Sequence, residues 1–217
     1  MPELPEVETV RRRLVPHLTG RTLAEVEIFD HRLTDPEPPS TVASRLSGAR
    51  IHALGRRGKY LLIELEDGAE ALLAGKLGPE PLGDWTVAEL VGALAGRKAP
   101  VKAALLDQRV VAGVGNIYAD EALFAARVHP AAPAGRLSRT RVARVQDAVR
   151  AALQAGIDAQ GASIRDFRTP DGGYGSAQER FAAYGRGGEP CERCGTTLRR
   201  TVIAQRGTVY CPHCQRF

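Results

Sequence analysis

Apolar side chains in the first eighteen residues recur at the spacing of one helix face. Pro5 and Glu6 suit a first helical turn, and Gly20 suits the position after a helix end. The pattern therefore predicts a helix over residues 2–18 that begins almost at the terminus. The apolar positions of its stripe are Leu4, Val7, Val10, Leu14 and Leu18.

Short β-like runs follow this helix, separated by clusters of glycine, proline and aspartate. They predict a small sheet region. Between the first two runs, residues 35–40 form a polar, proline-rich loop, and Ser40 is a suitable N-cap for a short helix over residues 41–47. The predicted strands cover residues 22–29, 49–54, 60–65 and 69–73.

The pattern changes after Leu77, where residues 78–83 have the composition of a linker and the following segments are rich in alanine. We place a domain boundary there and expect three units, over residues 1–77, 78–183 and 184–217. Helices are predicted over residues 86–96, 100–107, 117–126 and 138–155, the last with Ser138 as N-cap and Gly156 at its end, followed by a glycine-rich loop over 160–176 and a final helix near 176–183.

The composition, 43% hydrophobic and 25% charged over 217 residues, is typical of a soluble globular protein. No apolar run approaches the roughly 18 residues of a membrane span, and the start lacks the features of a signal peptide, so we expect a cytoplasmic protein. Residues 1–100 hold 13 basic and 15 acidic side chains, whereas residues 101–217 hold 17 and 10. The basic half favours a polyanion partner, although an ordinary solvated face produces the same bias.

All four cysteines lie near the C-terminus, in two CxxC pairs separated by sixteen residues. This spacing is typical of a zinc ribbon, in which four thiolates surround one tetrahedral zinc ion. Four free cysteines are the alternative, but they would leave the last 27 residues almost without a core. Four thiolates leave no position for water, so the zinc is expected to be structural and His213 to lie at the surface. The predicted ligands are Cys191, Cys194, Cys211 and Cys214.

The N-terminus offers chemistry of another kind. Removal of Met1, which a small second residue permits, would expose the secondary amine of Pro2. An α-amino group has a pKa of about 8, so part of it is an uncharged nucleophile near neutral pH that can attack an aldehyde-like carbon. Glu3 and Glu6 lie close enough in sequence to supply a proton. The alternative is that these residues only open a helix.

Three turns carry candidate anion contacts. Residues 113–116 place two glycines and Asn116 beside a helix N-terminus, which either binds an anion or forms only a tight turn between helices. The hairpin between the cysteine pairs would present Arg206 to a phosphate, or leave it an ordinary surface arginine. The turn at residues 55–60 would direct Lys59 at a phosphate or a substrate, or only into solvent.

Together and in this order, these motifs closely resemble the formamidopyrimidine-DNA glycosylases, the MutM or Fpg branch of the Fpg/Nei family. The resemblance covers residues 1–73 and about 77–217, and the PELPEVET start favours this branch over the Nei branch. The motifs that carry it are PELPEVET at residues 2–9, RGKY at 57–60, GVGNIYADE at 113–121 and the four-cysteine ribbon.

The resemblance implies an α+β protein with an N-terminal helix, a β-sandwich, a helix–two-turn–helix domain and a zinc finger, with double-stranded DNA in the cleft between the domains. It implies a bifunctional enzyme of base excision repair. Such an enzyme removes oxidised purines, chiefly 8-oxoguanine and formamidopyrimidines, and then nicks the abasic strand by β,δ-elimination. One structural Zn²⁺ and a monomeric state are expected.

The resemblance also assigns roles to individual residues. Pro2 corresponds to the nucleophile that attacks C1′ and forms the Schiff base, and Glu3 to the acid that protonates the sugar ring. Lys59 corresponds to the lysine that contacts phosphate and assists elimination, and Arg206 is placed in the same catalytic set. The residues that correspond to binding positions for the DNA backbone are Arg97, Lys102, Gly115, Asn116 and Arg206.

A further segment, residues 161–175, resembles the flexible loop that closes over the flipped base. Ser163 and Tyr174 lie in this loop. Because a base must leave the stack before its C1′ can be attacked, unstacking has to be offset by contacts to the DNA backbone and by groups that fill the gap left by the base.

The chain departs from the family between Leu73 and Gly78, where four residues stand in place of several strands. In the family the missing stretch holds the methionine, arginine and phenylalanine that fill the gap left by the flipped base, and Met1 is the only methionine here. A shortened sheet also exposes edges and part of its apolar face. We therefore expect abasic-site cleavage to survive better than 8-oxoguanine excision.

Two other functions stay open. A catalytically weak module for DNA or abasic sites predicts salt-dependent duplex binding without a covalent adduct. A Nei-type glycosylase would prefer oxidised pyrimidines. Because Pro2, Glu3 and Lys59 are all retained, we favour the enzyme that acts on oxidised purines.

Overall fold

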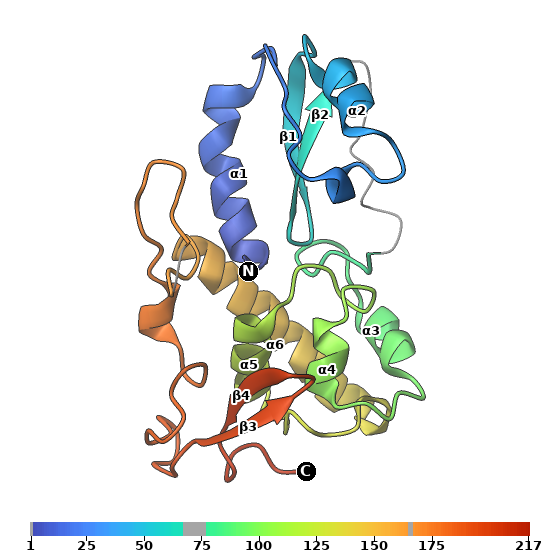
Figure 1. Cartoon of the computed structure of the whole chain (residues 1–217). Helices are drawn as coiled ribbons and strands as arrows, with labels where there is room; N and C mark the ends of the chain where they lie inside the picture. The colour runs from blue at the N-terminus through green and yellow to red at the C-terminus, as the bar shows by residue number, and fades with distance from the viewer. Residues whose placement is uncertain (1, 67–76, 165–166) are drawn as a thin grey trace.

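The molecule has an upper part, with the N-terminal helix and a small sheet, and a lower part of helices and a C-terminal hairpin (Figure 1). This computed structural model describes residues 2–66, 77–164 and 167–217. Its elements are α1 (Leu4–Leu18), η1 (His31–Leu33), α2 (Pro39–Leu46), β1 (Ile51–Arg57), β2 (Tyr60–Leu65), α3 (Val87–Leu94), α4 (Val101–Leu106), α5 (Asn116–Ala125), η3 (Ala134–Arg136), α6 (Arg139–Asp158), η4 (Ala177–Arg180), β3 (Arg199–Ile203) and β4 (Arg206–Tyr210).

Helix α1 joins the two parts. Its first residue, Leu4, is fully buried in the core of the lower part, and its N–H donates to the Gly113 carbonyl at 3.0 Å. The Glu6 carboxylate accepts the Glu3 N–H at 2.8 Å and so satisfies one of the free donors at the helix start. The apolar stripe of the second half packs against β1 and β2. The predicted N-terminal helix is thus confirmed, and its first helical residue is Leu4.

Strands β1 and β2 form an antiparallel hairpin in which Arg57 lies opposite Tyr60 at the turn. The buried side chains of Ile51, Leu54 and Leu65 form a small core with the second half of α1. These strands confirm the β runs expected at 49–54 and 60–65, shifted at the first by two or three residues.

The strand expected over residues 22–29 is wrong. Within the described residues of this run, only Thr22 makes a ladder contact, an isolated bridge with Arg50, and the Phe29 side chain is 91% exposed. A β pattern becomes a strand only where a neighbour accepts its backbone hydrogen bonds along its length. The strand expected over residues 69–73 lies outside the described residues.

The predicted helices of the lower part are confirmed as α3, α4, α5 and α6, with ends shifted by up to three residues. Ser138 caps α6 as expected, because its hydroxyl accepts the Arg141 N–H. The expected end at Gly156 is wrong, since α6 continues to Asp158. Gly156 instead allows close packing: a Cβ there would lie 2.5 Å from the Tyr118 ring.

Two shorter helices also differ from expectation. Ser40 lies inside α2 and does not cap it, because Pro39, with its fixed φ, occupies the first helical position. The helix expected near 176–183 is reduced to the single 3₁₀ turn η4.

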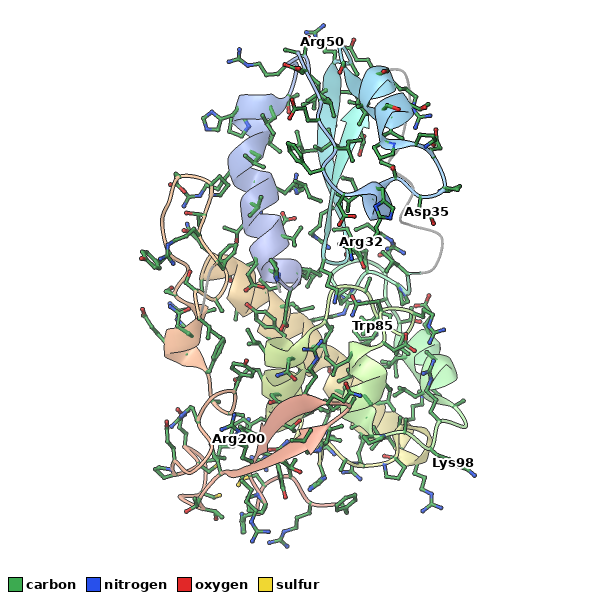
Figure 2. All side chains as sticks on the ribbon, in the orientation of Figure 1. Arg32, Asp35, Arg50, Trp85, Lys98 and Arg200 are labelled. Atoms are coloured by element: carbon green, nitrogen blue, oxygen red, sulfur yellow. The ribbon has the colours of Figure 1, made fainter. Side chains whose placement is uncertain are left out.

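The core of the lower part lies among α3, α4, α5 and α6. Trp85, labelled in Figure 2, is buried at the start of α3, and its carbonyl accepts the Gln146 side-chain N–H of α6 at 2.7 Å. Across the described ranges, no helix is both long and apolar enough to cross a membrane.

The C-terminal hairpin of β3 and β4 packs on α5. Its two-residue turn, Ala204 and Gln205, has positive φ at both positions, so Ile203 pairs directly with Arg206. The Val209 N–H donates to the Asp120 carboxylate of α5 at 3.1 Å. The hairpin is therefore fixed to the helical part close to the first turn of α5.

Candidate functional site

The start of α1 lies near α5 and the β1–β2 turn (Figure 1). Pro2 is exposed, whereas the adjacent Glu3 is buried with 6% of its surface accessible. The Glu3 carboxylate accepts the N–H groups of Ile117 at 2.9 Å and of Tyr118 at 3.3 Å. The Glu3 carboxyl group is thus fixed beside the exposed Pro2, whose nitrogen becomes a secondary amine when Met1 is removed.

Burial changes the acidity of this carboxyl group. Desolvation raises the pKa of Glu3 to about 7, and the neighbouring Glu6 adds to this, while the backbone N–H groups of α5 oppose it. Near neutral pH a substantial fraction of Glu3 is therefore protonated, so the group can act as an acid.

Gly115 makes this placement possible. A Cβ on Gly115 would lie 2.3 Å from the Glu3 Cδ atom, so any larger residue would displace the carboxyl group. From the sequence, the amides next to this glycine either bind an external anion or form only a tight turn between helices. The anion at the α5 N-terminus is instead the protein's own Glu3.

Glu6 connects three segments at the same place. Its carboxylate accepts the Glu3 N–H, the Tyr118 hydroxyl at 3.0 Å and the Ala162 N–H at 2.8 Å. The sequence alone indicates Glu6 only as a helix-start residue or a proton source. The connection to the loop at Ala162 spans 156 residues of sequence, and no local pattern indicates it.

Lys59 lies at the turn between β1 and β2 and is half-buried. Its pKa is lowered, first by burial and further by the positive charge of Arg206, while the charge of Glu3 opposes the shift. The turn that carries Lys59 lies against residues 112–113, and Asn116 at the start of α5 binds the residue next to Arg206, so both groups lie near the Glu3 carboxyl group although they are far apart in sequence.

Asn116 and Arg206 meet at the same edge. The Asn116 side-chain N–H donates to the Gly207 carbonyl at 3.1 Å, next to Arg206 on the hairpin. The Asn116 Oδ1 atom is buried and has no hydrogen-bond partner within the described part of the chain. Arg206 itself is exposed, as the hairpin pattern predicts.

Lys102 does not lie where the resemblance puts it. It is fully buried, and its ammonium group contacts the Asp120 carboxylate at 2.7 Å, the Thr208 hydroxyl at 2.8 Å and the Gly207 carbonyl at 3.1 Å. A direct phosphate contact is therefore not available to Lys102 in this structure. The reason is tertiary: residues 207 and 208 of the hairpin cover Lys102, and the sequence around Lys102 does not indicate this contact.

Arg97 lies in the loop after α3. Its guanidinium donates to the Ala93 carbonyl and pairs with Asp107 at 3.2 Å, and its side chain is 37% exposed. No described contact joins it to the Glu3 region, so a phosphate contact at Arg97 stays a prediction.

The loop after α6 contacts the site through its first residues. The Ser163 hydroxyl donates to the Phe167 carbonyl and accepts the Gly175 N–H, both at 3.0 Å, which ties the two ends of the loop. Tyr174 is 64% exposed and stacks under the Arg168 guanidinium at 3.8 Å.

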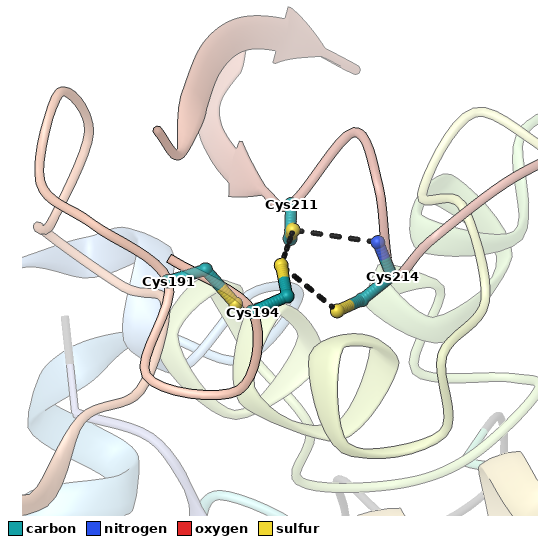
Figure 3. A group of neighbouring side chains, drawn as sticks. All are labelled: Cys191, Cys194, Cys211 and Cys214. Atoms are coloured by element: carbon teal, nitrogen blue, oxygen red, sulfur yellow. Dashed lines mark hydrogen bonds between the residues drawn. The ribbon is translucent and has the colours of Figure 1, made fainter. Parts of the chain in front are cut away.

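The four cysteines converge as predicted (Figure 3). Their Sγ atoms lie within 4.8 Å of one another. Zinc–sulfur bonds of about 2.3 Å in a tetrahedron place sulfur atoms about 3.8 Å apart, so the cluster fits one zinc ion without rearrangement of the chain. All four positions would be filled by protein, so this zinc is structural. The ligands are Cys191, Cys194, Cys211 and Cys214.

Three family profiles match the chain. Residues 1–90 match the formamidopyrimidine-DNA glycosylase N-terminal domain, and residues 77–168 match the H2TH domain of the same enzymes. Residues 188–216 match the zinc finger found in FPG and IleRS. Together the three matches cover most of the sequence.

Curated relatives agree with these profiles. The formamidopyrimidine-DNA glycosylase of Rhizorhabdus wittichii is 41% identical, with all of both chains covered. That of Chloroflexus aurantiacus is 38% identical, covering 99% of this chain and 98% of the relative. The latter alignment spans 272 positions against 217 residues here, so at least 55 of its positions have no counterpart in this chain.

Solved structures with the same fold include the MutM (Fpg) protein of Thermus thermophilus, with a TM-score of 0.88 and 37% identity over 99% of this chain and 98% of that one. A complex of Lactococcus lactis Fpg with DNA containing an abasic site has a TM-score of 0.88 at 29% identity, over 99% of this chain and 100% of that one. A complex of the same L. lactis enzyme with Fapy-dG DNA has a TM-score of 0.87 at 28% identity, with equal coverage.

Proposed function

Because the chain belongs to the formamidopyrimidine-DNA glycosylase family, it is a DNA glycosylase of base excision repair, and we propose that Pro2 and Glu3 are its reacting groups. The observation that carries this proposal is the pairing of an exposed Pro2 with a buried Glu3 carboxyl. Its substrates are oxidised purines in double-stranded DNA and the abasic sites that their removal leaves.

In the proposed reaction the uncharged nitrogen of Pro2 attacks C1′ of the damaged nucleotide, and the base departs with the electron pair of the glycosidic bond. The proton that the Pro2 nitrogen releases passes to the departing base, so that the base leaves in its neutral form. Protonated Glu3 then gives its proton to the sugar-ring oxygen as the ring opens, which leaves a Schiff base on Pro2. The raised pKa of Glu3, about 7, keeps this proton available near neutral pH. Elimination from the Schiff base nicks the strand.

Phosphate binding is proposed for the groups around this centre. Lys59, Asn116 and Arg206 come from three separate segments and face one region. Lys59 would hold the phosphate next to the lesion and assist elimination, and Arg206 offers a planar donor for a second phosphate. Arg97 would contact DNA farther along the duplex.

The three units proposed from the sequence would divide this work. Residues 1–77 carry Pro2, Glu3 and Lys59, residues 78–183 carry the α5 N-terminus, and residues 184–217 carry Arg206. The structural zinc holds the knuckles from which the Arg206 hairpin projects. We propose that the enzyme acts as a monomer, because one chain supplies all of these groups.

Borohydride reduction of the Schiff base tests the proposal. Mixed with a duplex that contains one abasic site, the protein is expected to form a covalent adduct at Pro2, and Pro2→Gly, which keeps a primary α-amine, a weaker one. The mass of the mature protein should lack Met1, since a retained methionine would block the amine. Duplex binding without any adduct from the wild type would instead support the alternative of a catalytically weak binding module, which the 55 or more absent positions favour.

A further inference from the structure

The hairpin that carries Lys59 has little sheet around it. Strands β1 and β2 form a two-stranded sheet within the described residues, and an isolated two-stranded hairpin is marginally stable in water. The turn at Gly58 and Lys59 lies at the end of this hairpin, beyond its small core of Ile51, Leu54 and Leu65. Contacts from outside the sheet must therefore hold Lys59 in place.

Glu80, in the linker before α3, supplies such contacts. One of its carboxylate oxygens accepts the N–H of Gly58, and the other accepts Arg56 Nη1 at 2.9 Å. Arg56 Nη1 also donates to the Gly58 carbonyl at 2.8 Å. Both backbone polar groups of the residue before Lys59 are thus bound by one ion pair.

This ion pair is shielded and extended. The side chains of Arg56 and Glu80 are only 12% and 22% exposed, and Arg56 Nε donates to Glu8 of α1 at 3.1 Å. Arg57, between Arg56 and Gly58, donates to the Gly78 carbonyl of the linker at 2.9 Å. Partial burial makes such charged hydrogen bonds stronger than exposed pairs.

The linker is itself fixed on the lower part. The Gly78 N–H donates to the Gln108 carbonyl at 2.8 Å, and the Pro79 carbonyl accepts the Ala112 N–H at 3.0 Å. A Cβ on Gly78 would lie 2.6 Å from the Arg109 carbonyl oxygen, so the linker lies directly against this loop. The same loop leads to Gly115, which bounds the Glu3 carboxyl group.

We propose that Glu80 is a positioning residue for Lys59, holding the β1–β2 turn on the linker so that the lysine faces Glu3. The inference rests on the proposed function, because Lys59 has a role only if the protein cleaves abasic DNA. In this proposal the linker, and not a complete β-sandwich, holds Lys59 in position. Lys59 can therefore stay in place although 55 or more positions of the relatives are absent from this chain.

A double-mutant cycle on abasic-site nicking tests the proposal. Glu80→Ala is expected to lower kcat about tenfold with little change in KM, since small displacements of a reacting group have effects of this size or larger. Glu80→Gln, which keeps an acceptor for the Gly58 N–H, should lose less. In a Lys59→Ala background, Glu80→Ala should have no further effect, because the residue it positions is gone. Equal losses in both backgrounds, or no loss in either, would overturn the proposal.

Glu37→Gln is the control, because Glu37, like Glu80, accepts an N–H group on each carboxylate oxygen. Both of its donors belong to Arg45, at the surface of the upper part. This substitution should leave nicking unchanged.

Hydrogen exchange at the Gly58 amide is a second readout that needs no activity. It should become about tenfold faster in Glu80→Ala than in Glu37→Gln, and equal exchange would refute the contact. The wild type could neither nick DNA nor form a trapped adduct with it, while exchange at the Gly58 amide is still faster in Glu80→Ala. In that case the proposed function fails, but the contact between Glu80 and Gly58 is confirmed.

Discussion

At the residue scale, two opposing effects set the pKa of Glu3. Its burial disfavours the charged form, whereas two backbone N–H groups of α5 favour it. The balance places its pKa at about 7, where a small change in pH changes the protonated fraction most. An exposed glutamate in the same sequence position would be ionised at this pH and unable to donate a proton.

This balance predicts the pH dependence of base excision. Because protonated Glu3 is the acid and the uncharged amine of Pro2 is the nucleophile, their two fractions offset each other between about pH 7 and about pH 8, the pKa of an α-amine. The rate should therefore fall about tenfold per pH unit only above about pH 8, and Glu3→Gln should be slower by about 10² or more without that fall. Single-turnover excision from pH 6 to 9 measures both. A wild-type slope that is unchanged in Glu3→Gln would contradict the assignment.

Stability gives an independent check on the same group. The pKa of Glu3 is raised on folding from 4.5 to about 7, so its contribution to stability is fully present below about pH 4.5 and is lost as the pH rises through about 7. The free energy of unfolding of the wild type should therefore fall relative to that of Glu3→Gln over this range.

At the scale of secondary-structure elements, the position of β4 determines the contacts of Lys102. Helix α4 alone would present this lysine to solvent, but β4 covers it and supplies two of its hydrogen-bond acceptors. Lys102 and Asn116 both donate to the Gly207 carbonyl, so the residue next to Arg206 is fixed from two helices.

Salt dependence of DNA binding separates the two basic residues. Arg206→Ala should reduce the slope of log K against log salt by about 1, because one phosphate contact is lost. Lys102→Met should leave that slope unchanged but destabilise the fold by about 3–5 kcal/mol, because Asp120 stays buried without its partner. Titrations at several salt concentrations and thermal unfolding measure these effects. A reduced slope for Lys102→Met would instead show that Lys102 contacts a phosphate.

Zinc acts on the same element. Removal of zinc by a chelator should release the two knuckles and with them the hairpin that carries Arg206, since the last 27 residues have a core of only a few buried side chains. DNA affinity is expected to fall at least about tenfold and to return on addition of Zn²⁺. If the DNA affinity were unchanged after the loss of zinc had been verified, α5 alone would be shown to hold the hairpin.

At the scale of the whole molecule, the chain retains the reacting groups and the basic half but lacks 55 or more positions found in its relatives. The resemblance assigns to the absent stretch the side chains that fill the gap left by a flipped base. An abasic site has no base to extrude, so the loss should affect the two reactions unequally.

We therefore expect abasic-site nicking to survive better than 8-oxoguanine excision. The ratio of borohydride trapping on abasic DNA to that on 8-oxoguanine DNA should be at least about tenfold greater than for a full-length relative, which corresponds to about 1.4 kcal/mol of lost extrusion energy. Equal trapping on both substrates would show that the remaining residues suffice.

Much of this protein follows from local sequence. The helix at the N-terminus, the four helices of the lower part and the zinc cluster were predictable, because amphipathic spacing, capping residues and paired cysteines act over a few residues. The chemistry of Pro2, Glu3 and Lys59 was readable as motifs, although their roles came from the resemblance.

The tertiary structure alone decided the rest, because it depends on contacts between distant segments. Lys102 became a buried ion-pair partner through a hairpin more than a hundred residues away, and residues 22–29 form no strand because their pairing with residues 48–50 ends at Leu23. The pKa of Glu3 is raised by burial, and Glu80 binds the turn before Lys59 because folding brings the two segments together. No local sequence pattern indicates either effect. Sequence determined which chemical groups are present, and folding determined their environment.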